Sequence, residues 1–179
     1  IVLTGVDITG WGKDIEESKS LGDLVELILL ENPTLGRLRL SSLDISEIDE
    51  KLIRLFKKEY RLMPHLHLSL QSGNNMILKR MKRRHSREET IELCNKLREA
   101  RPELTFGADL IAGFPTENED MFNDTLNLIG ECAITWLHIF PYSSRQGTPA
   151  SRMPQVQRET ILQRAESLRK HAIERKKMH

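Results

Sequence analysis

The hydrophobic positions of the chain follow two periodicities. Strands are predicted where short apolar or alternating runs occur, at residues 1–3, 37–40, 66–70, 104–112 and 134–140. Helices are predicted where apolar side chains recur three and four positions apart, at residues 20–30, 46–55, 74–81, 88–100, 116–129 and 155–177. Capping pairs are expected to open three of these helices: Ser46 with Asp49, Ser86 with Glu89, and Thr116 with Glu119.

This order of elements predicts an α/β fold. Strands that alternate with helices form parallel sheets joined by right-handed crossovers. About five strands are too few to close an eight-stranded barrel, so we expect an open, partial βα barrel. The chain begins within its first strand, which suggests a truncated domain. No linker divides residues 1–179, which we interpret as one partial domain.

One predicted strand carries polar residues on a whole face. Leu66, Leu68 and Leu70 point one way, and the other way point His65, His67, Ser69 and Gln71. Parallel strands are usually buried on both faces, and buried polar groups cost free energy unless they bind something. The pattern therefore predicts a binding face, with a solvated edge strand as the alternative.

Further polar residues lie on or near the ends of other strands. Ser41 and Ser42 end one strand, and Asp109 lies inside another. Ligands of open α/β sheets bind beyond the carboxyl ends of the strands, so these residues are candidates for a ligand site. Asp109 is alternatively a structural acid that accepts hydrogen bonds from backbone amides.

Three further segments add candidates with weaker signals. Gly113 opens a tight strand-to-helix turn, which either admits a ligand or is ordinary turn chemistry. The basic run 79–84 either offsets a helix dipole or supplies an arginine that grips a carboxylate. The polar loop 142–149 is either a binding loop or a plain connection.

Bulk composition narrows the function classes. Charged residues make up 30% of the chain with a formal net charge of +1, so no global basic signal for nucleic acid exists. The two cysteines, Cys94 and Cys132, lack metal-type spacing. Apolar runs are too short to span a bilayer and no secretory signal is visible, so we expect a cytoplasmic protein that does not enter a membrane.

Several motifs together resemble the radical S-adenosylmethionine (SAM) methylthiotransferases. The matching segments, in chain order, are residues 2–7, 65–73, 78–83, 109–115 with Glu117, and 147–150. They cover nearly the whole chain, and their joint occurrence is more specific than any single piece. Residues 137–143 look most like the branch that acts on threonylcarbamoyl-adenosine beside the tRNA anticodon. The neighbouring branches act on isopentenyl-adenosine and on a ribosomal-protein aspartate.

The resemblance implies an enzyme that cleaves SAM reductively and inserts a methylthio group through a radical. Its cofactors are SAM and 4Fe–4S clusters, and its partners are the tRNA anticodon stem-loop and a reductant protein. It implies the TIM-barrel-like radical SAM fold, with SAM at the carboxyl ends of the strands. It also implies an amino-terminal cluster-binding segment and a carboxy-terminal RNA-binding domain that residues 1–179 do not contain.

The resemblance also assigns roles by position. The turn with Thr4, Gly5 and Asp7 matches the one that meets the methionine amino group, and Ser41 or Ser42 matches a polar position near SAM. Gln71 and Asp109 match residues near the ribose. Arg83, twelve residues after Gln71, matches the arginine that pairs with the methionine carboxylate, and the Gly113 turn matches the backbone at the adenine. No catalytic residue is assigned.

The chain departs from the family at the cluster. The family holds its 4Fe–4S cluster through three cysteines spaced C-x-x-x-C-x-x-C, and residues 1–179 contain no such motif. Cys94 shares an apolar helix face with Ile91 and Leu97, and Cys132 lies at a helix end. We therefore expect this part of the protein to be inactive by itself.

Two other functions fit parts of the pattern. A metal-dependent hydrolase would ring a zinc ion with His65, His67, Asp109 and His138, because imidazoles and carboxylates on barrel strands bind zinc. A non-catalytic scaffold would account for the missing cysteine motif and the basic run 79–84.

Overall fold

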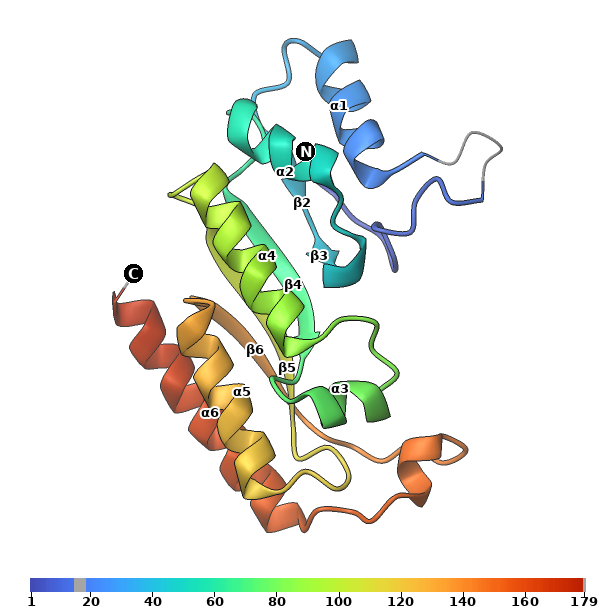
Figure 1. Cartoon of the computed structure of the whole chain (residues 1–179), viewed down its shortest axis with the longest axis vertical. Helices are drawn as coiled ribbons and strands as arrows, with labels where there is room; N and C mark the ends of the chain where they lie inside the picture. Colours follow the sequence, from blue (N-terminus) through green and yellow to red (C-terminus); the bar gives the residue numbers. More distant parts are fainter. Residues whose placement is uncertain (15–18, 179) are drawn as a thin grey trace. The chain divides into compact units, whose positions relative to one another are not determined.

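The computed structural model describes residues 1–14 and 19–178 (Figure 1). Its helices and strands are β1 (Val2–Leu3), α1 (Leu21–Glu31), β2 (Arg39–Leu40), β3 (Ser42–Leu43), α2 (Glu50–Lys58), β4 (His65–Gln71), α3 (Asn75–Arg80), α4 (Arg87–Ala100), β5 (Thr105–Ala112), α5 (Glu119–Glu131), β6 (Trp136–Pro141) and α6 (Arg158–Met178). They fall into two compact units. Unit 1 comprises Ile1–Ser69 and Leu93–Phe106, and unit 2 comprises Leu70–Glu92 and the chain from Gly107 onward.

The strand pairings that the structure defines are parallel. β1 pairs with β2, β3 with β4, and β5 with β6. Strands β3, β4, β5 and β6 are hydrogen-bonded neighbours in that order, so the sheet of the described residues is open. The predicted α/β class with parallel strands is therefore confirmed. Strand β3, with two residues, was not expected as an element of its own.

Unit 1 corrects one predicted helix start. The prediction that Ser46 caps a helix is wrong: α2 begins at Glu50 and is capped by Asp49, whose carboxylate accepts from the Leu52 amide at 2.7 Å. Ser46 instead lies in a short 3₁₀ turn capped by Asp44. Asp49 also accepts from the Gly22 amide at 3.2 Å, and this bond joins α2 to the start of α1. A carboxylate that satisfies the exposed amides of two helices outcompetes a single hydroxyl.

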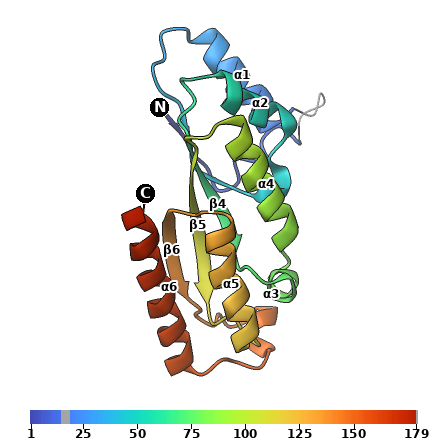
Figure 2. The ribbon, with the colours of Figure 1, turned by 60° about the vertical axis from the view of Figure 1, so that its left-hand side comes forward.

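Unit 2 confirms one cap and corrects another. Ser86 and Glu89 form the predicted reciprocal capping box of α4. The cap of α5 is Asn118 rather than Thr116, because Thr116 adopts a left-handed backbone with φ of 70° that cannot begin a helix. Helices α5 and α6 lie alongside β6 in two views (Figures 1 and 2), and α6 buries Ala165 and Leu168 of its predicted stripe.

The alternation predicted for residues 65–71 is present in β4. Leu66, Leu68 and Leu70 are at most 1% exposed, whereas the four polar residues are half-buried. The polar residues therefore share a face that the hydrophobic core does not fill. In the described ranges, no helix is long and apolar enough to cross a membrane.

Candidate cofactor-binding site

A cavity of about 400 Å³ opens in unit 2 where β4 ends. We call it the unit 2 cavity. Its lining consists of Gln71, residues 80–83 at the end of α3, Ile111, Phe114 and residues 148–150. Two residues that the resemblance assigned to one ligand, Gln71 and Arg83, therefore lie at the same cavity. The lining includes residues from four of the five resembling segments.

The backbone at this cavity is held in an uncommon conformation. Gln71 and Lys82 have φ values of 66° and 58°, in the left-handed region that costs a residue with a side chain roughly 1–2 kcal/mol. At Lys82 the cause is local: α3 ends in a Schellman turn, in which the Arg83 amide donates to the Leu78 carbonyl at 2.9 Å. That turn fixes the backbone from which the Arg83 side chain leaves. Left-handed residues concentrate at ligand sites, which supports a binding role for both segments.

The lining combines cations with apolar walls. Arg80, Lys82 and Arg83 bring positive charge, and Arg80 is anchored because its guanidinium donates to the Thr116 hydroxyl. Phe114 forms the apolar side and packs edge-on against Tyr142, with ring centroids 5.4 Å apart. A guanidinium matches a carboxylate bidentately, and the Gln71 amide both donates and accepts. The cavity is therefore suited to an organic ligand that carries a carboxylate and hydroxyl groups.

The Gly113 turn has a packing role that the sequence did not reveal. Gly113 has a φ of 73°, and a Cβ at this position would lie 2.5 Å from Cγ1 of Ile161 on α6. Its amide donates to the buried Glu117 carboxylate at 3.0 Å. Because that amide is already engaged, a ligand at this turn would have to contact other atoms. The adenine role of Gly113 stays a prediction.

Glu117 is held by a buried ion pair. Arg164 of α6 lies 2.9 Å from the Glu117 carboxylate, and both side chains are less than 10% exposed. Burial raises the pKa of Glu117, and the Arg164 charge opposes that rise. Sequence reasoning missed this pair, although a charged residue between the apolar positions Ile161 and Ala165 of a helix was a usable signal. The pair ties α6 to the turn beside the unit 2 cavity.

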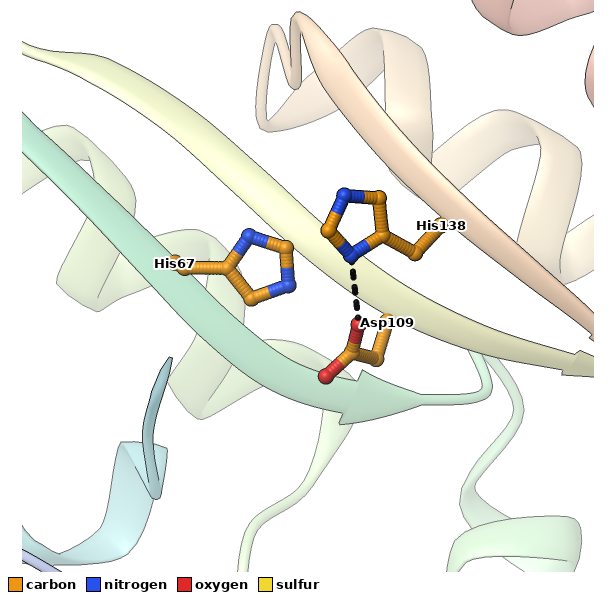
Figure 3. A group of neighbouring side chains, drawn as sticks. All are labelled: His67, Asp109 and His138. Carbon is orange, nitrogen blue, oxygen red and sulfur yellow. Dashed lines mark hydrogen bonds and ion pairs between the residues drawn. The ribbon is translucent and has the colours of Figure 1, made fainter. Parts of the chain in front are cut away.

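Asp109 lies next to the unit 2 cavity but does not line it. Its strand neighbour Ile111, two positions further along β5, belongs to the lining. Asp109 is in register with His138 on β6, and the His138 Nδ1 lies 3.2 Å from the Asp109 carboxylate (Figure 3). This pair is a donor–acceptor couple on one face of the sheet. The ribose role of Asp109 stays a prediction.

The hydrolase alternative draws its ligands from both units. Asp109 and His138 belong to unit 2, whereas His65 and His67 belong to unit 1. Burial, followed by the Arg39 and His67 charges, lowers the pKa of His65, so its imidazole is neutral near pH 7. Zinc in the purified protein, measured by elemental analysis, remains the test of this alternative.

The amino-terminal candidates lie at a separate cavity of about 300 Å³, the unit 1 cavity. Thr4, Gly5 and Asp7 line it together with apolar residues such as Leu3 and Trp11. The Asp7 carboxylate accepts from the Thr9 hydroxyl and the Gly10 amide, both at 3.0 Å. A carboxylate at a small cavity suits an amine, but here it is already used by its own turn.

The two serines lie outside the unit 1 cavity lining. Ser42 is exposed on β3 and is in register with His67. The Ser41 amide donates to the Leu3 carbonyl at 2.9 Å. The Ser41 hydroxyl oxygen is buried, and within residues 1–14 and 19–178 it has no hydrogen-bond partner. Buried hydroxyls are usually paired, so Ser41 is the better candidate of the two for contact with a ligand.

The cysteines do not fit an iron–sulfur cluster. Cys94 and Cys132 are both fully buried and belong to different units. The expectation that Cys94 is a core residue is confirmed. A cluster needs several thiolates around one position, so its ligands would have to come from outside residues 1–179.

A comparison of the sequence with models of protein families identifies the superfamily of the chain. Residues 1–129 match the model of the Radical SAM superfamily. The chain belongs to the radical SAM superfamily. Relatives agree with the resemblance in the motifs: the threonylcarbamoyladenosine tRNA methylthiotransferase MtaB of Rickettsia prowazekii is 53% identical over 94% of this chain. The corresponding enzyme of Bacillus subtilis is 40% identical over 86% of the chain. The predicted membership of the radical SAM enzymes is thus confirmed.

Solved structures share the fold of this radical SAM chain. Coproporphyrinogen III oxidase from Escherichia coli superposes with a TM-score of 0.65 at 20% identity, covering 88% of this chain and 38% of that one. The methyltransferase TsrM from Kitasatospora setae reaches 0.59 at 15% identity, covering 78% and 26%. The chain spans 40% of the length of the Rickettsia relative and 34% of the Bacillus relative. It therefore corresponds to part of those proteins.

Proposed function

We propose that the protein to which residues 1–179 belong is a cytoplasmic radical SAM methylthiotransferase that acts on tRNA. It adds a methylthio group to a threonylcarbamoyl-modified adenosine beside the anticodon. The single observation that carries the proposal is the unit 2 cavity, which Gln71 and Arg83 both line. The backbone at Gln71 and at Lys82, next to Arg83, is held in the left-handed conformation. The names of the relatives support the choice of substrate. Other relatives are named for dimethylallyladenosine, such as the one from Shouchella clausii at 40% identity. This nucleoside is therefore the alternative substrate.

Different residues of the unit 2 cavity contact different parts of SAM. The Arg83 guanidinium pairs with the carboxylate of the methionine end, and the Gln71 amide hydrogen-bonds a ribose hydroxyl. Phe114 and Ile111 cover the apolar edge of the ligand and exclude water from it. SAM held by these residues would supply one-electron radical chemistry to the reaction. The reductant protein and the cluster act through other parts of the protein.

The Glu117–Arg164 pair acts as a positioning element in this proposal. It holds the Gly113 turn against α6 and so keeps Phe114 at the cavity wall. Residues 1–179 alone are proposed to be inactive and to bind SAM weakly, because they supply no cluster ligands. The roles of Thr4, Gly5, Asp7, Ser41 and Ser42 continue to rest on the resemblance.

The test of the proposal is the product of the full-length protein. Protein with reconstituted clusters, SAM, a sulfur donor and a reductant is incubated with tRNA from cells that lack the methylthio modification. Nucleosides from the digested tRNA are then analysed by mass spectrometry. We expect a methylthio adduct on the threonylcarbamoyl-adenosine. An adduct found only on dimethylallyl-adenosine or on a protein aspartate, or SAM cleavage without an adduct, would contradict the proposal.

A further inference from the structure

Three side chains on one face of β6 are exposed although they lie inside a regular strand. Trp136 is 37% exposed and Phe140 is 51% exposed, and between them His138 has a side chain that is 65% exposed. Successive residues of a strand point to opposite faces, so these three share one face. We call them the β6 row. Parallel strands usually bury both faces, so an exposed aromatic row inside one requires an explanation.

We propose that the β6 row is the surface on which bases of the target RNA stack. This inference rests on the proposed function and adds to it the residues that contact the nucleobases. Bases of single-stranded RNA are commonly held by stacking on aromatic side chains, while their edges form hydrogen bonds with polar groups. The β6 row offers both kinds of contact along one strand.

The register with β5 places the row beside the cofactor cavity. Trp136 is opposite Gly107, His138 is opposite Asp109, and Phe140 is opposite Ile111. Because Ile111 lines the unit 2 cavity, Phe140 is the member of the row next to that cavity. Neighbouring strands lie about 4.8 Å apart, so a base stacked on Phe140 would lie close to a ligand in that cavity.

The neighbours of the other two members favour a base over an apolar peptide. Gly107, opposite Trp136, has no side chain, so β5 places no side chain directly beside the Trp136 ring. The His138–Asp109 pair provides a donor and an acceptor suited to the edge of a base. An apolar segment packed on the row would have to bury this polar pair, which costs free energy unless both groups are satisfied.

Cations from α6 follow the same strand. The Lys176 ammonium lies 4.8 Å from the centre of the Trp136 ring. Arg169 donates to the backbone carbonyl of Ile139 on β6, and Arg175 donates to that of Ile134 just before the strand. Positive side chains next to stacking aromatics are the usual composition of a surface for single-stranded nucleic acid, because the cations pair with phosphates. The charge thus matches an RNA strand laid along β6.

The test compares two substitutions of Phe140 in the full-length protein. Phe140→Leu keeps an apolar side chain but removes the aromatic ring, whereas Phe140→Tyr keeps the ring. The Kd for a fluorescently labelled anticodon stem-loop RNA is measured by anisotropy at fixed salt, and the Kd for SAM by calorimetry. We expect Phe140→Leu to weaken RNA binding about 5- to 100-fold and Phe140→Tyr to change it less than about threefold. Neither should change SAM affinity more than about twofold.

Leu162→Ala, at a half-exposed apolar position of α6 outside the row, is the matched control and should leave RNA affinity unchanged. Equal RNA affinity of wild type and Phe140→Leu would overturn the inference. Equal losses in the Leu and Tyr variants, with lower thermal stability, would overturn it too, since another part of the protein would then cover the row. The RNA affinities do not depend on which product forms, so failure of this inference and failure of the proposed function are distinguishable.

Discussion

The unit 1 cavity and the unit 2 cavity differ in the rigidity of the segments that surround them. The unit 2 cavity lies at the end of a seven-residue strand, and a Schellman turn and a buried ion pair fix its neighbours. The unit 1 cavity is formed largely by loop residues after a two-residue strand. Its carboxylate, Asp7, is used by hydrogen bonds of its own turn. Only the unit 2 cavity is therefore preorganised for a ligand by the fold around it.

The charges at the two cavities also differ in sign. Three cations line the unit 2 cavity, whereas the unit 1 cavity has one carboxylate among apolar residues. Preorganised charges cost little reorganisation when a ligand binds, so the unit 2 cavity should dominate affinity for a carboxylate-bearing ligand. We therefore expect the candidates on the more rigid segments, Gln71 and Arg83, to contribute more to ligand binding than Thr4, Gly5 and Asp7.

The largest expected effect concerns the buried support of the unit 2 cavity. Glu117→Ala removes the buried partner of the Arg164 guanidinium, leaves it the exposed Glu119 carboxylate at 3.1 Å, and should lower the free energy of unfolding by about 3–5 kcal/mol. Urea denaturation followed by circular dichroism measures this loss. Lys170→Ala, which breaks the exposed pair between Lys170 and Glu166, is the control and should cost less than about 0.5 kcal/mol. Similar losses of unfolding free energy in the two variants would contradict the proposal that the buried pair makes the unit 2 cavity rigid.

A smaller effect concerns backbone strain at Gln71. Gln71→Gly relieves the left-handed conformation, so the free energy of unfolding should stay the same or rise by up to about 1 kcal/mol. SAM affinity should nevertheless fall, because the amide side chain is lost. A variant that is at least as stable as wild type but binds SAM more weakly would show that Gln71 adopts the strained conformation for ligand binding. A clear loss of stability would show instead that Gln71 is a structural residue.

The smallest effect is a difference in pH dependence between the units. Hydrogen bonds from Lys51 and from the Ser20 amide lower the pKa of Asp23 in unit 1 from 3.8 to about 2. Its stabilising contribution is therefore present above pH 4 and is lost as the pH falls through about 2. The raised pKa of Glu117 has the opposite sign, so its contribution is present below pH 4.5 and is lost as the pH rises through its folded pKa.

Variants that remove each carboxyl group separate the two contributions. Asp23→Asn should flatten the acid limb of a plot of stability against pH by less than about 1 kcal/mol, because the Asp23 side chain is 38% exposed and solvent screens its ion pair. Glu117→Gln should remove the decline above pH 4.5. Thermal melts of both variants between pH 2 and 6 measure the slopes. Equal slopes in wild type and variants would mean that neither carboxyl group responds to folding as stated.

The sequence predicted the helices and strands better than the caps, ion pairs and close contacts that stabilise them. The alternation in 65–71 was sufficient to define β4 and its polar face, because strand side chains repeat every second residue. The caps at Asp49 and Asn118 were missed because several side chains competed for the same amides, and local spacing does not rank them. The Glu117–Arg164 pair and the contact of Gly113 with Ile161 join distant segments. Without coordinates, only the charge within the α6 stripe pointed to them.

The measurement that tests the central claim most directly is calorimetry of SAM binding to the full-length protein with Arg83 replaced. Arg83→Ala should weaken SAM affinity about 10- to 100-fold, because it removes a charge-assisted pair with the ligand carboxylate. Lys79→Ala, an exposed position of the same basic run outside the cavity lining, should leave affinity within about twofold. If Arg83→Ala binds SAM as tightly as Lys79→Ala and wild type, the unit 2 cavity is not the SAM site.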